Sequence, residues 1–531
     1  MTDLLNLQHF LFEQTPSRIE LLKYQSTTSG KKKVRVFRNH SFELIAKTMN
    51  AYLDYSGLGI DFSYSDYDDS FSFSDFDNTA DCILIWADAQ RYKEIDISSF
   101  FAERINTLRQ KYAKPVILAV TGNKIKLNIP DVFVVDLLSV EQKFGKDFLD
   151  LKMEPFTGTR LSQTACLYLS ERFGLKYFPA VLKPALKAVF VDLDNTLYQG
   201  VLGEDGISGV TLTPGHKILQ EKLKGLVTQG IFLCAVSKNN QADVEKMFAE
   251  RKDFPLKSSD FTKMTASWRS KSEMISETLN FLNIGADSSV FIDDNIGEIS
   301  EVSAALPQIR YILANSDAEK TINILDRSPG FIQFNATKED SLRKNDVQAN
   351  EERRKLQATL SHDDFLRRLK MELRILCDDV AGKERIAQLA GKTNQFIFNY
   401  KRYSLSEIEK LMADKNAVVV SLHLKDTLSD SGMIGALVLK KENDTAVLEE
   451  CFISCRALGR GIDDLIIFKA IECGLQKLEA SKLQVLFQNG ERNEPARLFF
   501  EKHLSDFKLP HLFEKVPQTD LISFVYGEEN E

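Results

Sequence analysis

Cysteine is scarce in this sequence, with 7 residues in a chain of 531. The seven are an odd number scattered among apolar neighbours, so they fit the reduced thiols of a cytoplasmic protein better than a disulfide framework. No stretch approaches the roughly 20 apolar residues of a membrane helix. Asp3 and Glu13 also stand where a secretory signal needs a basic flank and an uninterrupted apolar core. We therefore expect a cytoplasmic protein with no membrane partner.

Proline and glycine are also sparse, at 13 and 26 residues. Together with 43% hydrophobic and 27% charged residues, these numbers exclude collagen-like and wholly disordered chains and indicate folded domains. Acidic residues outnumber basic ones, 76 to 68, for a net charge of −8. Because broad binding to nucleic acid depends on neutralising phosphates, this balance argues against a nucleic-acid partner.

The length suggests three or four domains at about 150 residues each. Apolar runs alternate with amphipathic helical patterns over 1–181 and again over 182–334, which predicts two α/β domains with parallel sheets. Residues 61–79, rich in Asp, Ser and aromatics, predict a surface loop or an alternating edge segment. Residues 335–356 are almost free of apolar side chains and predict a polar linker. Over 357–531, consecutive strands joined by short turns predict an α+β domain with a mostly antiparallel sheet.

These predictions rest on apolar runs and on helical periodicity. The runs that predict strands cover 34–37, 82–86, 115–120, 188–191, 231–236, 289–292, 418–422, 433–439 and 447–453. The helical patterns lie near 98–112, 214–229, 240–250, 271–282, 297–305, 362–373, 381–391, 405–414 and 462–471.

The clearest chemical motif follows the apolar strand at 188–191, whose carboxyl end delivers Asp192 and Asp194. Ligands of open α/β sheets bind at that edge. A carboxylate at the strand tip can attack phosphorus and form an aspartyl phosphate, while a second one, two residues later, can protonate the leaving oxygen and then activate water. Because two carboxylates repel a phosphate, the pair implies a bound Mg²⁺.

Further polar groups follow later strands in the same domain. Ser237 ends the next strand, where its hydroxyl can hold a phosphate oxygen. Lys271 begins a helical pattern and can neutralise a transferring phosphoryl group. Asp293 and Asp294 follow a third apolar strand and predict a metal ligand. The ordered set predicts a phosphoryl-transfer site for a phosphorylated small molecule.

The same D-x-D-x-T pattern occurs a second time, at Asp75, Asp77 and Thr79. The apolar strand belonging to that copy comes after it, at 82–86, so its acids would lie at the wrong edge of a sheet. We interpret it as a chance copy.

The motifs DLDNT and FIDDN, with Ser237 and Lys271, resemble the haloacid dehalogenase superfamily of Mg²⁺-dependent phosphatases. The resemblance implies a doubly wound, Rossmann-like parallel sheet for 182–334. It also implies that Asp192 is the nucleophile, that Asp194 is the acid and base, and that Ser237 and Lys271 hold the phosphate.

The metal ligands implied by the resemblance are Asp192, the Asp194 carbonyl and Asp293, with Asp294 just outside the ligand shell. The segment between Asp194 and the next helical pattern is too short for a large cap domain. An open site of this kind suits a bulky or protein-tethered substrate.

A second motif lies near the carboxyl end, where a strand runs into a basic, glycine-bearing turn and then a helical pattern. Glycines allow close backbone approach and a helix N-terminus favours an anion, so this turn can cradle a pyrophosphate. It resembles the coenzyme A loop of GNAT-type N-acyltransferases. The residues concerned are Arg456, Gly459, Arg460 and Gly461.

Cys455 lies beside this turn. Since a helix N-terminus lowers the pKa of a thiol, Cys455 can be read as a thioester nucleophile. The simpler interpretation is a small residue that packs at the end of a strand, because free cysteines are commonly buried.

Together with 200–206 and 385–396, these motifs resemble the FkbH-like family over nearly the whole chain. Its longer members fuse a haloacid dehalogenase phosphatase to an amino-terminal SGNH/flavodoxin-like α/β region and a carboxy-terminal GNAT-like domain. The resemblance implies transfer of a glyceryl unit from a phosphorylated three-carbon intermediate to an acyl carrier protein, with coenzyme A or phosphopantetheine as the thiol. The region 1–181 lacks a G-D-S nucleophile motif at 38–41 and an Asp-x-x-His, so we expect a structural or partner-binding role for it.

The sequence thus predicts an Mg²⁺-dependent phosphatase or phosphotransferase, coupled to acyl transfer on a phosphopantetheine carrier. Two alternatives stay open. One is an N-acyltransferase that uses acyl-coenzyme A on an amino-sugar-like acceptor and has an accessory phosphatase. The other is a binding scaffold with a vestigial site.

Overall fold

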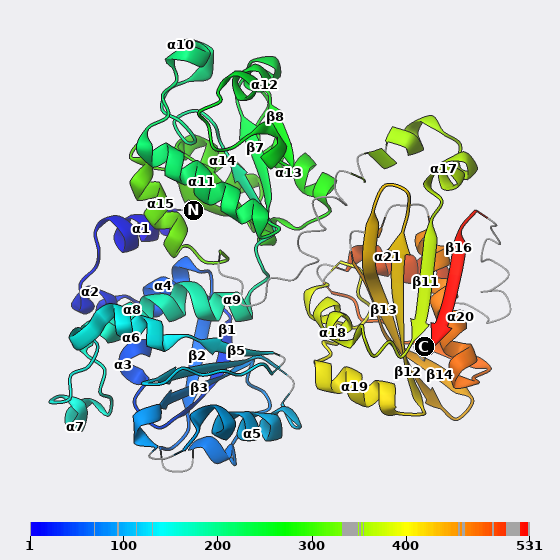
Figure 1. Ribbon diagram of the computed structural model, residues 1–531, viewed down its shortest axis with the longest axis horizontal. Helices are drawn as coiled ribbons and strands as arrows, with labels where there is room; N and C mark the ends of the chain where they lie inside the picture. Colours follow the sequence, from blue (N-terminus) through cyan, green and yellow to red (C-terminus); the bar gives the residue numbers. More distant parts are fainter. Residues whose placement is uncertain are drawn as a thin grey trace. The chain divides into compact units, whose positions relative to one another are not determined.

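The computed structural model divides the chain into two compact units, residues 1–336 and 337–531 (Figure 1). It describes the whole sequence except residues 1, 68–69, 93–94, 113, 130, 332–348, 350–351, 354, 394, 455–456, 459–461, 491–492, 506–520 and 529–531. Within the described residues, the first unit contains two five-stranded sheets and the second unit one six-stranded sheet.

The first sheet consists of parallel strands in the order β2-β1-β3-β4-β5. Apolar residues fill its central strands because helices cover both faces, with α8 on one side and α5 on the other (Figure 1). The strands are β1 (Lys31–Arg38), β2 (Gly59–Tyr64), β3 (Cys82–Asp88), β4 (Val116–Thr121) and β5 (Val132–Val135). The α-helices of this part are α1 (Thr2–Gln8), α2 (Arg18–Lys23), α3 (Glu43–Ala46), α4 (Asn50–Tyr55), α5 (Ile97–Arg109), α6 (Leu137–Phe144), α7 (Glu154–Thr157), α8 (Gln163–Arg172) and α9 (Phe178–Leu182).

The second sheet is also parallel, in the order β10-β9-β6-β7-β8. From the central strand β6 the chain adds β7 and β8 on one side and then β9 and β10 on the other, which places a topological switch point between β6 and β9. The strands are β6 (Ala188–Val191), β7 (Phe232–Ser237), β8 (Lys263–Ala266), β9 (Ser289–Asp293) and β10 (Arg310–Leu313). The helices are α10 (Leu202–Gly209), α11 (Pro214–Thr228), α12 (Gln241–Glu250), α13 (Lys271–Leu282), α14 (Ile296–Ala305) and α15 (Ala318–Arg327).

Side-chain hydrogen bonds connect the two sheet regions of the first unit. The Gln8 amide donates to the Leu313 carbonyl over 2.9 Å and accepts from the Leu313 N–H over 3.1 Å. This pairing satisfies backbone groups on the edge strand β10, which would otherwise be open to another strand. Arg327 of α15 also donates to both carboxylate oxygens of Glu171 in α8, at 2.9 and 2.7 Å.

The second unit is built on a mixed sheet in the order β15-β14-β13-β12-β11-β16. Its four middle strands are antiparallel, whereas β15 and β16 pair in parallel at the two edges. Apolar side chains of α20 and α21 cover one face, and those of α18 and α19 cover the other. The strands are β11 (Glu372–Cys377), β12 (Ala417–Lys425), β13 (Asp430–Glu442), β14 (Thr445–Ile453), β15 (Lys482–Val485) and β16 (Ser523–Glu528). The helices are α17 (His362–Leu369), α18 (Lys383–Lys392), α19 (Leu405–Ala413), α20 (Asp463–Leu478) and α21 (Glu494–His503).

The predictions of α/β architecture with parallel sheets and of a mostly antiparallel carboxy-terminal sheet are confirmed. The start of 61–79 belongs to the edge strand β2, which agrees with the interpretation as an alternating edge segment. One segment differs from its sequence interpretation. The helical pattern over 362–373 ends at Leu369, after which Lys370 adopts φ 45° and β11 begins. The left-handed residue terminates the helix, and the apolar residues that follow pair with β12.

Most of the predicted linker lies outside the described residues, but its end does not. The Arg353 guanidinium donates twice to the Asp426 carboxylate, each time over 2.8 Å, and both side chains are buried. This end of the segment therefore packs within the second unit.

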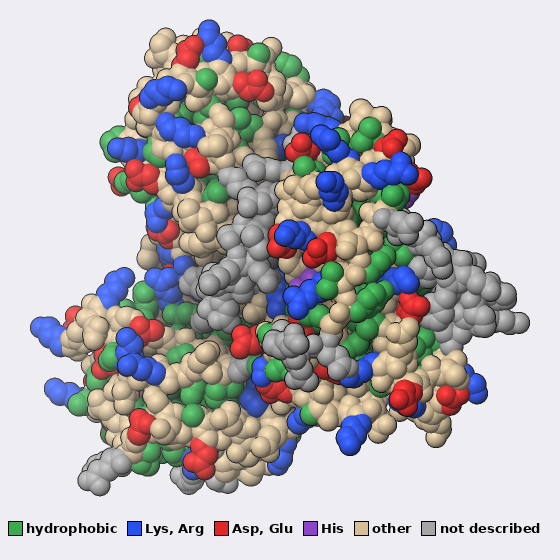
Figure 2. Space-filling view, turned by 45° about the vertical axis from the view of Figure 1, so that its right-hand side comes forward, with side chains coloured by type: hydrophobic (Ala, Val, Ile, Leu, Met, Phe, Trp, Pro, Cys, Tyr) green, Lys and Arg blue, Asp and Glu red, His purple; other side chains and the backbone are tan. Residues whose placement is uncertain are grey.

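Charged side chains of both signs are interspersed on the face seen in Figure 2. Among the residues that the structure describes, none of the helices combines the length and apolar character needed to cross a membrane.

Candidate active site

Two predicted site residues meet at the switch point of the second sheet. Val191 of β6 pairs with Ile292 of β9, so the next residues, Asp192 and Asp293, reach the same edge. The Asp192 N–H donates to the Ile292 carbonyl over 2.9 Å, which extends the pairing by one residue. Both carboxylates are buried. The edge rule for parallel sheets thus brings them together as the sequence predicts.

Lys271, the first residue of α13, lies between these two acids. Its buried Nζ is 2.6 Å from Asp293 Oδ2 and 3.0 Å from Asp192 Oδ1. Burial raises the pKa of Asp192, and burial together with the charge of Asp192 raises the pKa of Asp293 to about 7. Burial works against the charged form of Lys271, but the two carboxylates outweigh it and raise the lysine's pKa. The site therefore holds more acidic groups than one lysine neutralises.

A divalent cation fits this excess of negative charge. Asp192, Asp293 and Asp294 each offer a carboxylate oxygen, and these oxygens all lie within 4.8 Å of one another. Asp192 Oδ1 is buried and accepts no hydrogen bond of regular geometry, although the Lys271 ammonium lies close to it. Because hard oxygen donors are what Mg²⁺ prefers, this set of carboxylate oxygens fits the ion.

Asp294 belongs to this acidic group, whereas its sequence interpretation places it just outside the ligand shell. Its Oδ1 accepts a hydrogen bond from the Thr196 hydroxyl over 3.2 Å. Burial raises the pKa of its carboxyl group. Asp294 is thus available both to orient its neighbours and to face a cation.

Asp194, the predicted acid and base, is held by three donors. Its Oδ1 accepts from the Tyr198 hydroxyl at 2.6 Å and from the Leu202 N–H at 3.0 Å, while Oδ2 accepts from the Asn239 amide at 2.8 Å. The side chain therefore does not join the acidic group of Asp192 and Asp293. To protonate a leaving group, Asp194 must exchange at least one of these donors for the substrate.

Ser237, at the end of β7, is buried and is linked to Asp194 through a shared neighbour. The Asn239 amide donates to the Ser237 hydroxyl over 3.0 Å as well as to Asp194. The sequence analysis did not single out Asn239 or Tyr198. Their positions after strand ends, within the motifs SKNN and DLDNTLY, are the signal from which they could have been found.

The turn that follows the acid pair is tight and leads into a short segment before α11. Asn195 has φ 52°, and its side chain accepts from the Gly200 N–H over 3.0 Å. Gly200 has φ +109°, and a Cβ there would lie 2.8 Å from Asp205 Oδ2, so glycine is required. Before α11 only the 8-residue α10 intervenes, which agrees with the prediction that no large cap domain is present.

The second copy of the pattern forms no comparable site among the described residues. Asp75 pairs with Arg35, and Asp77 accepts from the Thr79 N–H over 2.7 Å as a local turn. Among the described residues, neither acid belongs to the group of carboxylates that could hold a metal ion. Their arrangement supports the chance interpretation.

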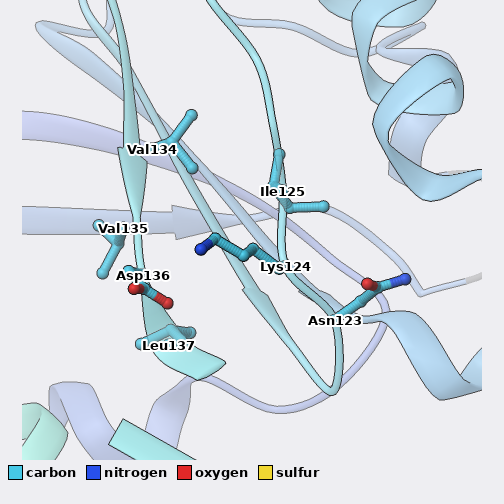
Figure 3. A pocket seen from close by; sticks show the side chains of 7 residues that line it. All are labelled: Asn123, Lys124, Ile125, Val134, Val135, Asp136 and Leu137. Carbon is cyan, nitrogen blue, oxygen red and sulfur yellow. The ribbon is translucent and has the colours of Figure 1, made fainter. Parts of the chain in front are cut away.

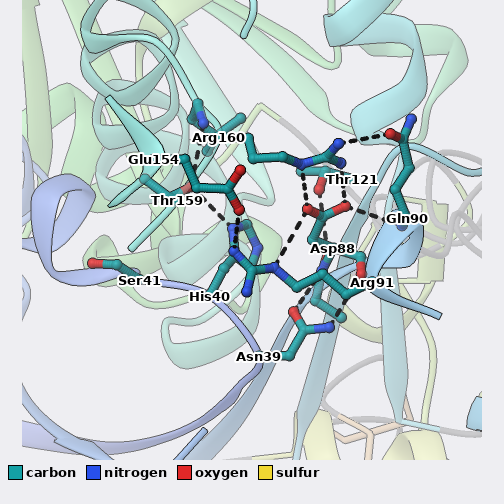
Figure 4. A network of polar contacts seen from close by, with 12 residues as sticks. Asn39, His40, Ser41, Asp88, Gln90, Arg91, Thr121, Glu154, Thr159 and Arg160 are labelled. Atoms are coloured by element: carbon teal, nitrogen blue, oxygen red, sulfur yellow. Dashed lines mark hydrogen bonds and ion pairs between the residues drawn. The ribbon is translucent and has the colours of Figure 1, made fainter. Parts of the chain in front are cut away.

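A polar network lies at the carboxyl ends of β1 and β3, the switch point of the first sheet (Figure 4). The Arg160 guanidinium donates to both oxygens of buried Asp88, at 2.7 and 2.6 Å. His40 is buried, with Nδ1 3.0 Å from the Thr159 hydroxyl, and burial lowers its pKa to about 3. The Ser41 hydroxyl donates instead to Glu43 over 2.8 Å. Serine and histidine are thus not joined as nucleophile and base, in agreement with the missing G-D-S motif.

A pocket of about 220 Å³ opens beside the carboxyl ends of β4 and β5 (Figure 3). Lys124 extends across it toward Asp136, which caps α6 by accepting from the Ser139 N–H. The pocket lies in the first sheet region, and none of the predicted site residues lines it.

The turn predicted to cradle a pyrophosphate is described only at its borders. Cys455, Arg456, Gly459, Arg460 and Gly461 lie outside the described residues. The flanking elements have the predicted order, since β14 ends at Ile453 and α20 begins at Asp463.

The edge of β14 before this turn is covered by another part of the second unit. Strand β15 pairs with β14 only as far as Leu448. Beyond it, Phe398 N–H donates to the Cys451 carbonyl and Ile453 N–H donates to the Phe396 carbonyl, at 3.1 and 2.9 Å. The buried Glu450 carboxylate fixes this segment by accepting from the Phe398 and Lys401 N–H groups, each over 2.8 Å.

Comparison with known proteins gives weak similarities only. No protein-family profile matches the chain, and a search of curated proteins finds no match. Thirteen chains of solved structures match. One is the N-terminal part of a Bacteroides fragilis protein containing a phosphatase domain, in complex with Mg, at 21% identity and a TM-score of 0.46, covering 62% of this chain and 99% of that one.

Two smaller matches lie at lower similarity. One is a HAD family enzyme from Bacteroides thetaiotaomicron, in complex with magnesium and inorganic phosphate, at 13% identity and a TM-score of 0.21, covering 25% of this chain and 96% of that one. The other is a predicted HAD-like family hydrolase from Porphyromonas gingivalis, at 14% identity and a TM-score of 0.19, covering 24% and 90%. At these TM-scores, the function has to be inferred from the geometry of the site.

Proposed function

We propose that the first unit is an Mg²⁺-dependent phosphatase or phosphotransferase of the haloacid dehalogenase type, acting through an aspartyl phosphate on Asp192. The observation that carries the proposal is the meeting of Asp192, Asp293 and Lys271 at the switch point of a parallel sheet, within 3.0 Å of the lysine Nζ. The three carboxylate oxygens of Asp192, Asp293 and Asp294, all within 4.8 Å of one another, add to it.

Asp192 is the group that attacks. One of its oxygens bonds to phosphorus while the bond from phosphorus to the leaving oxygen breaks. Lys271 and the Ser237 hydroxyl orient the phosphoryl oxygens and offset their charge. Asp192, Asp293 and the Asp194 carbonyl would hold the cation, with Asp294 beside them. When bound, Mg²⁺ supplies positive charge next to the phosphoryl oxygens.

Asp194 acts as the general acid and then as the general base. In the first step it protonates the leaving oxygen, and in the second it accepts a proton from the water that attacks the aspartyl phosphate. That second attack breaks the bond between phosphorus and Asp192 and releases phosphate. Tyr198 and Asn239 keep the Asp194 carboxylate in place between these events.

The test uses p-nitrophenyl phosphate as substrate and Mg²⁺ as the metal. We expect Asp192→Asn to abolish turnover and Asp194→Asn to accumulate a phosphorylated chain, which intact mass would detect, because hydrolysis of the intermediate lacks its base. Asp75→Asn, in the second copy of the pattern, is the matched control and should equal the wild type. Turnover that survives in Asp192→Asn would refute the mechanism.

We further propose that the second unit handles an acyl group on coenzyme A or phosphopantetheine, in the manner of the FkbH-like family. The order of strand β14, a basic glycine-bearing turn and helix α20 supports this reading. Because residues 396–399 cover the edge of β14 beyond Leu448, a pantetheine arm would approach through the turn rather than pair along the strand.

The product distinguishes this reading from N-acyl transfer. A carrier protein would be incubated with the chain, Mg²⁺ and 1,3-bisphosphoglycerate, and its intact mass measured. A glyceryl adduct on the carrier is expected, and it should be lost in Arg456→Ala. An amide product formed from acyl-coenzyme A, with no carrier adduct, would instead favour the N-acyltransferase.

A further inference from the structure

Two cysteines of the second unit bring their sulfur atoms together. Cys377 is the last residue of β11, and Cys473 lies in the middle of α20, which packs on that strand. Their Sγ atoms are 3.1 Å apart, although the two cysteines lie 96 positions apart in the sequence. The contact is therefore created by the fold and not by local sequence.

The two sulfurs differ in access to solvent. Cys377 is buried in the apolar layer between the sheet and α20, whereas Cys473 lies at its margin and is partly exposed. The remaining described cysteines, Cys82, Cys166, Cys234 and Cys451, are all buried. Of the described thiols, Cys473 is thus the one that an external reagent can reach.

The distance between the two sulfurs is the observation that points to a disulfide. A covalent bond needs the sulfurs at about 2.05 Å, so each has to move by only about half an ångström.

We propose that Cys377 and Cys473 form a site of reversible oxidation that reacts with low-molecular-weight disulfides. The reaction converts two protein thiols and one disulfide reagent into one protein disulfide and two small thiols. Such pairs in reduced compartments are transient and reactive rather than structural.

The different environments of the sulfurs set the order of events. The pKa of Cys473 is lowered because the Cys377 thiol can donate a hydrogen bond to its sulfur, so Cys473 is the thiolate that attacks. It forms a mixed disulfide and expels one small thiolate, which takes up the proton that Cys473 gave up. Cys377 then attacks the Cys473 sulfur, loses its own proton, and expels the second small thiol.

Oxidation joins the end of β11 to the middle of α20. The link closes a loop of 96 residues, which restricts the unfolded chain. We therefore expect the oxidised second unit to unfold at a higher temperature than the reduced one, with no change in the first unit.

The experiment treats the full chain with oxidised glutathione, blocks the remaining thiols with an alkylating agent, and maps peptides by mass spectrometry. In the wild type we expect a peptide pair joined through Cys377 and Cys473 that dithiothreitol separates. In Cys377→Ser the glutathione adduct should stay on Cys473. In Cys473→Ser no glutathione adduct should form on Cys377. Cys166→Ser, in the first unit, is the matched control and should behave as the wild type.

The wild-type result alone can overturn the proposal, so it does not depend on the variants folding. Absence of the 377–473 link, under conditions in which the urea-unfolded chain is oxidised, would refute it. An adduct trapped on Cys377 in Cys473→Ser would refute the proposed order of attack.

Discussion

Replacing Asp293 with asparagine is expected to stabilise the metal-free protein above neutral pH. The folded-state pKa of Asp293 is about 7, raised by burial and by the charge of Asp192, against an ordinary value of 3.8. The native chain therefore holds this proton more tightly than the unfolded chain. Below pH 3.8 the Asp293 carboxyl group is protonated in both states and does not lower the free energy of unfolding. As the pH rises from 3.8 toward 7, the unfolded chain loses this proton first, so the free energy of unfolding falls.

The size of the effect follows from the pKa difference. The rise from 3.8 to about 7 corresponds to about 4 kcal/mol at alkaline pH. This value already includes the hydrogen bond from Lys271, which by itself lowers the pKa of Asp293. We expect a gain of about 4 kcal/mol near pH 8 and a much smaller gain near pH 5.

Tryptophan fluorescence measures this quantity for the first unit alone. The sequence has 2 tryptophans, Trp86 and Trp268, and both lie in that unit. Urea unfolding would be followed in EDTA at both pH values, with Asp75→Asn as control. Mg²⁺ should then stabilise the wild type and leave Asp293→Asn unchanged, because ligand binding raises stability only where the site is intact. A variant that is no more stable than the wild type near pH 8 without metal would refute the reasoning.

Three further predictions concern other parts of the chain. His40 has a folded pKa of about 3 against 6.5, so the wild type should lose stability as the pH falls from about 6.5 toward 3, and His40→Gln should flatten that acid limb in urea titrations at several pH values. Tyr198→Phe removes one donor to Asp194, so kcat on p-nitrophenyl phosphate should fall about tenfold while the Mg²⁺ requirement is kept; an unchanged kcat would contradict the role of the hydroxyl. Arg353→Met removes the guanidinium that pairs with the buried Asp426 carboxylate and should destabilise the second unit by about 3–5 kcal/mol in circular dichroism melts. Asp426→Leu in the same chain should restore only part of this loss, because the Leu428 and Ser429 N–H groups also donate to Asp426.

Much of the fold could be predicted because apolar runs and helical periodicity are local. The runs at 188–191 and 289–292 correspond to β6 and β9, and the helical pattern at 271–282 corresponds to α13. Where prediction differed from structure, a tertiary contact decided the outcome. The helical pattern over 362–373 ends at Leu369 because the apolar residues that follow pair with β12, a strand distant in sequence.

The site residues that directly follow apolar strands could be predicted from the sequence. Asp192 and Asp293 follow apolar strands, and parallel strands place their ends at one edge. Asn239 and Tyr198 also follow strand ends, but this signal is weaker, because asparagine and tyrosine are ordinary in loops and their role depends on the carboxylate that they meet. The distance of Asp294 from the other acids likewise depends on the turn after β9.

The sequence by itself determined where most strands lie along the chain and which acids follow them. It also determined that the carboxy-terminal region is a different kind of domain. Each of these follows from residue type and spacing over a few neighbours. Only the tertiary structure decided which strands are adjacent, how Lys271 lies between Asp192 and Asp293, and that Cys377 meets Cys473 across 96 residues. The composition shows only that cysteines are scarce, and packing selects the two that touch. Such contacts depend on the positions of whole elements and not on local sequence.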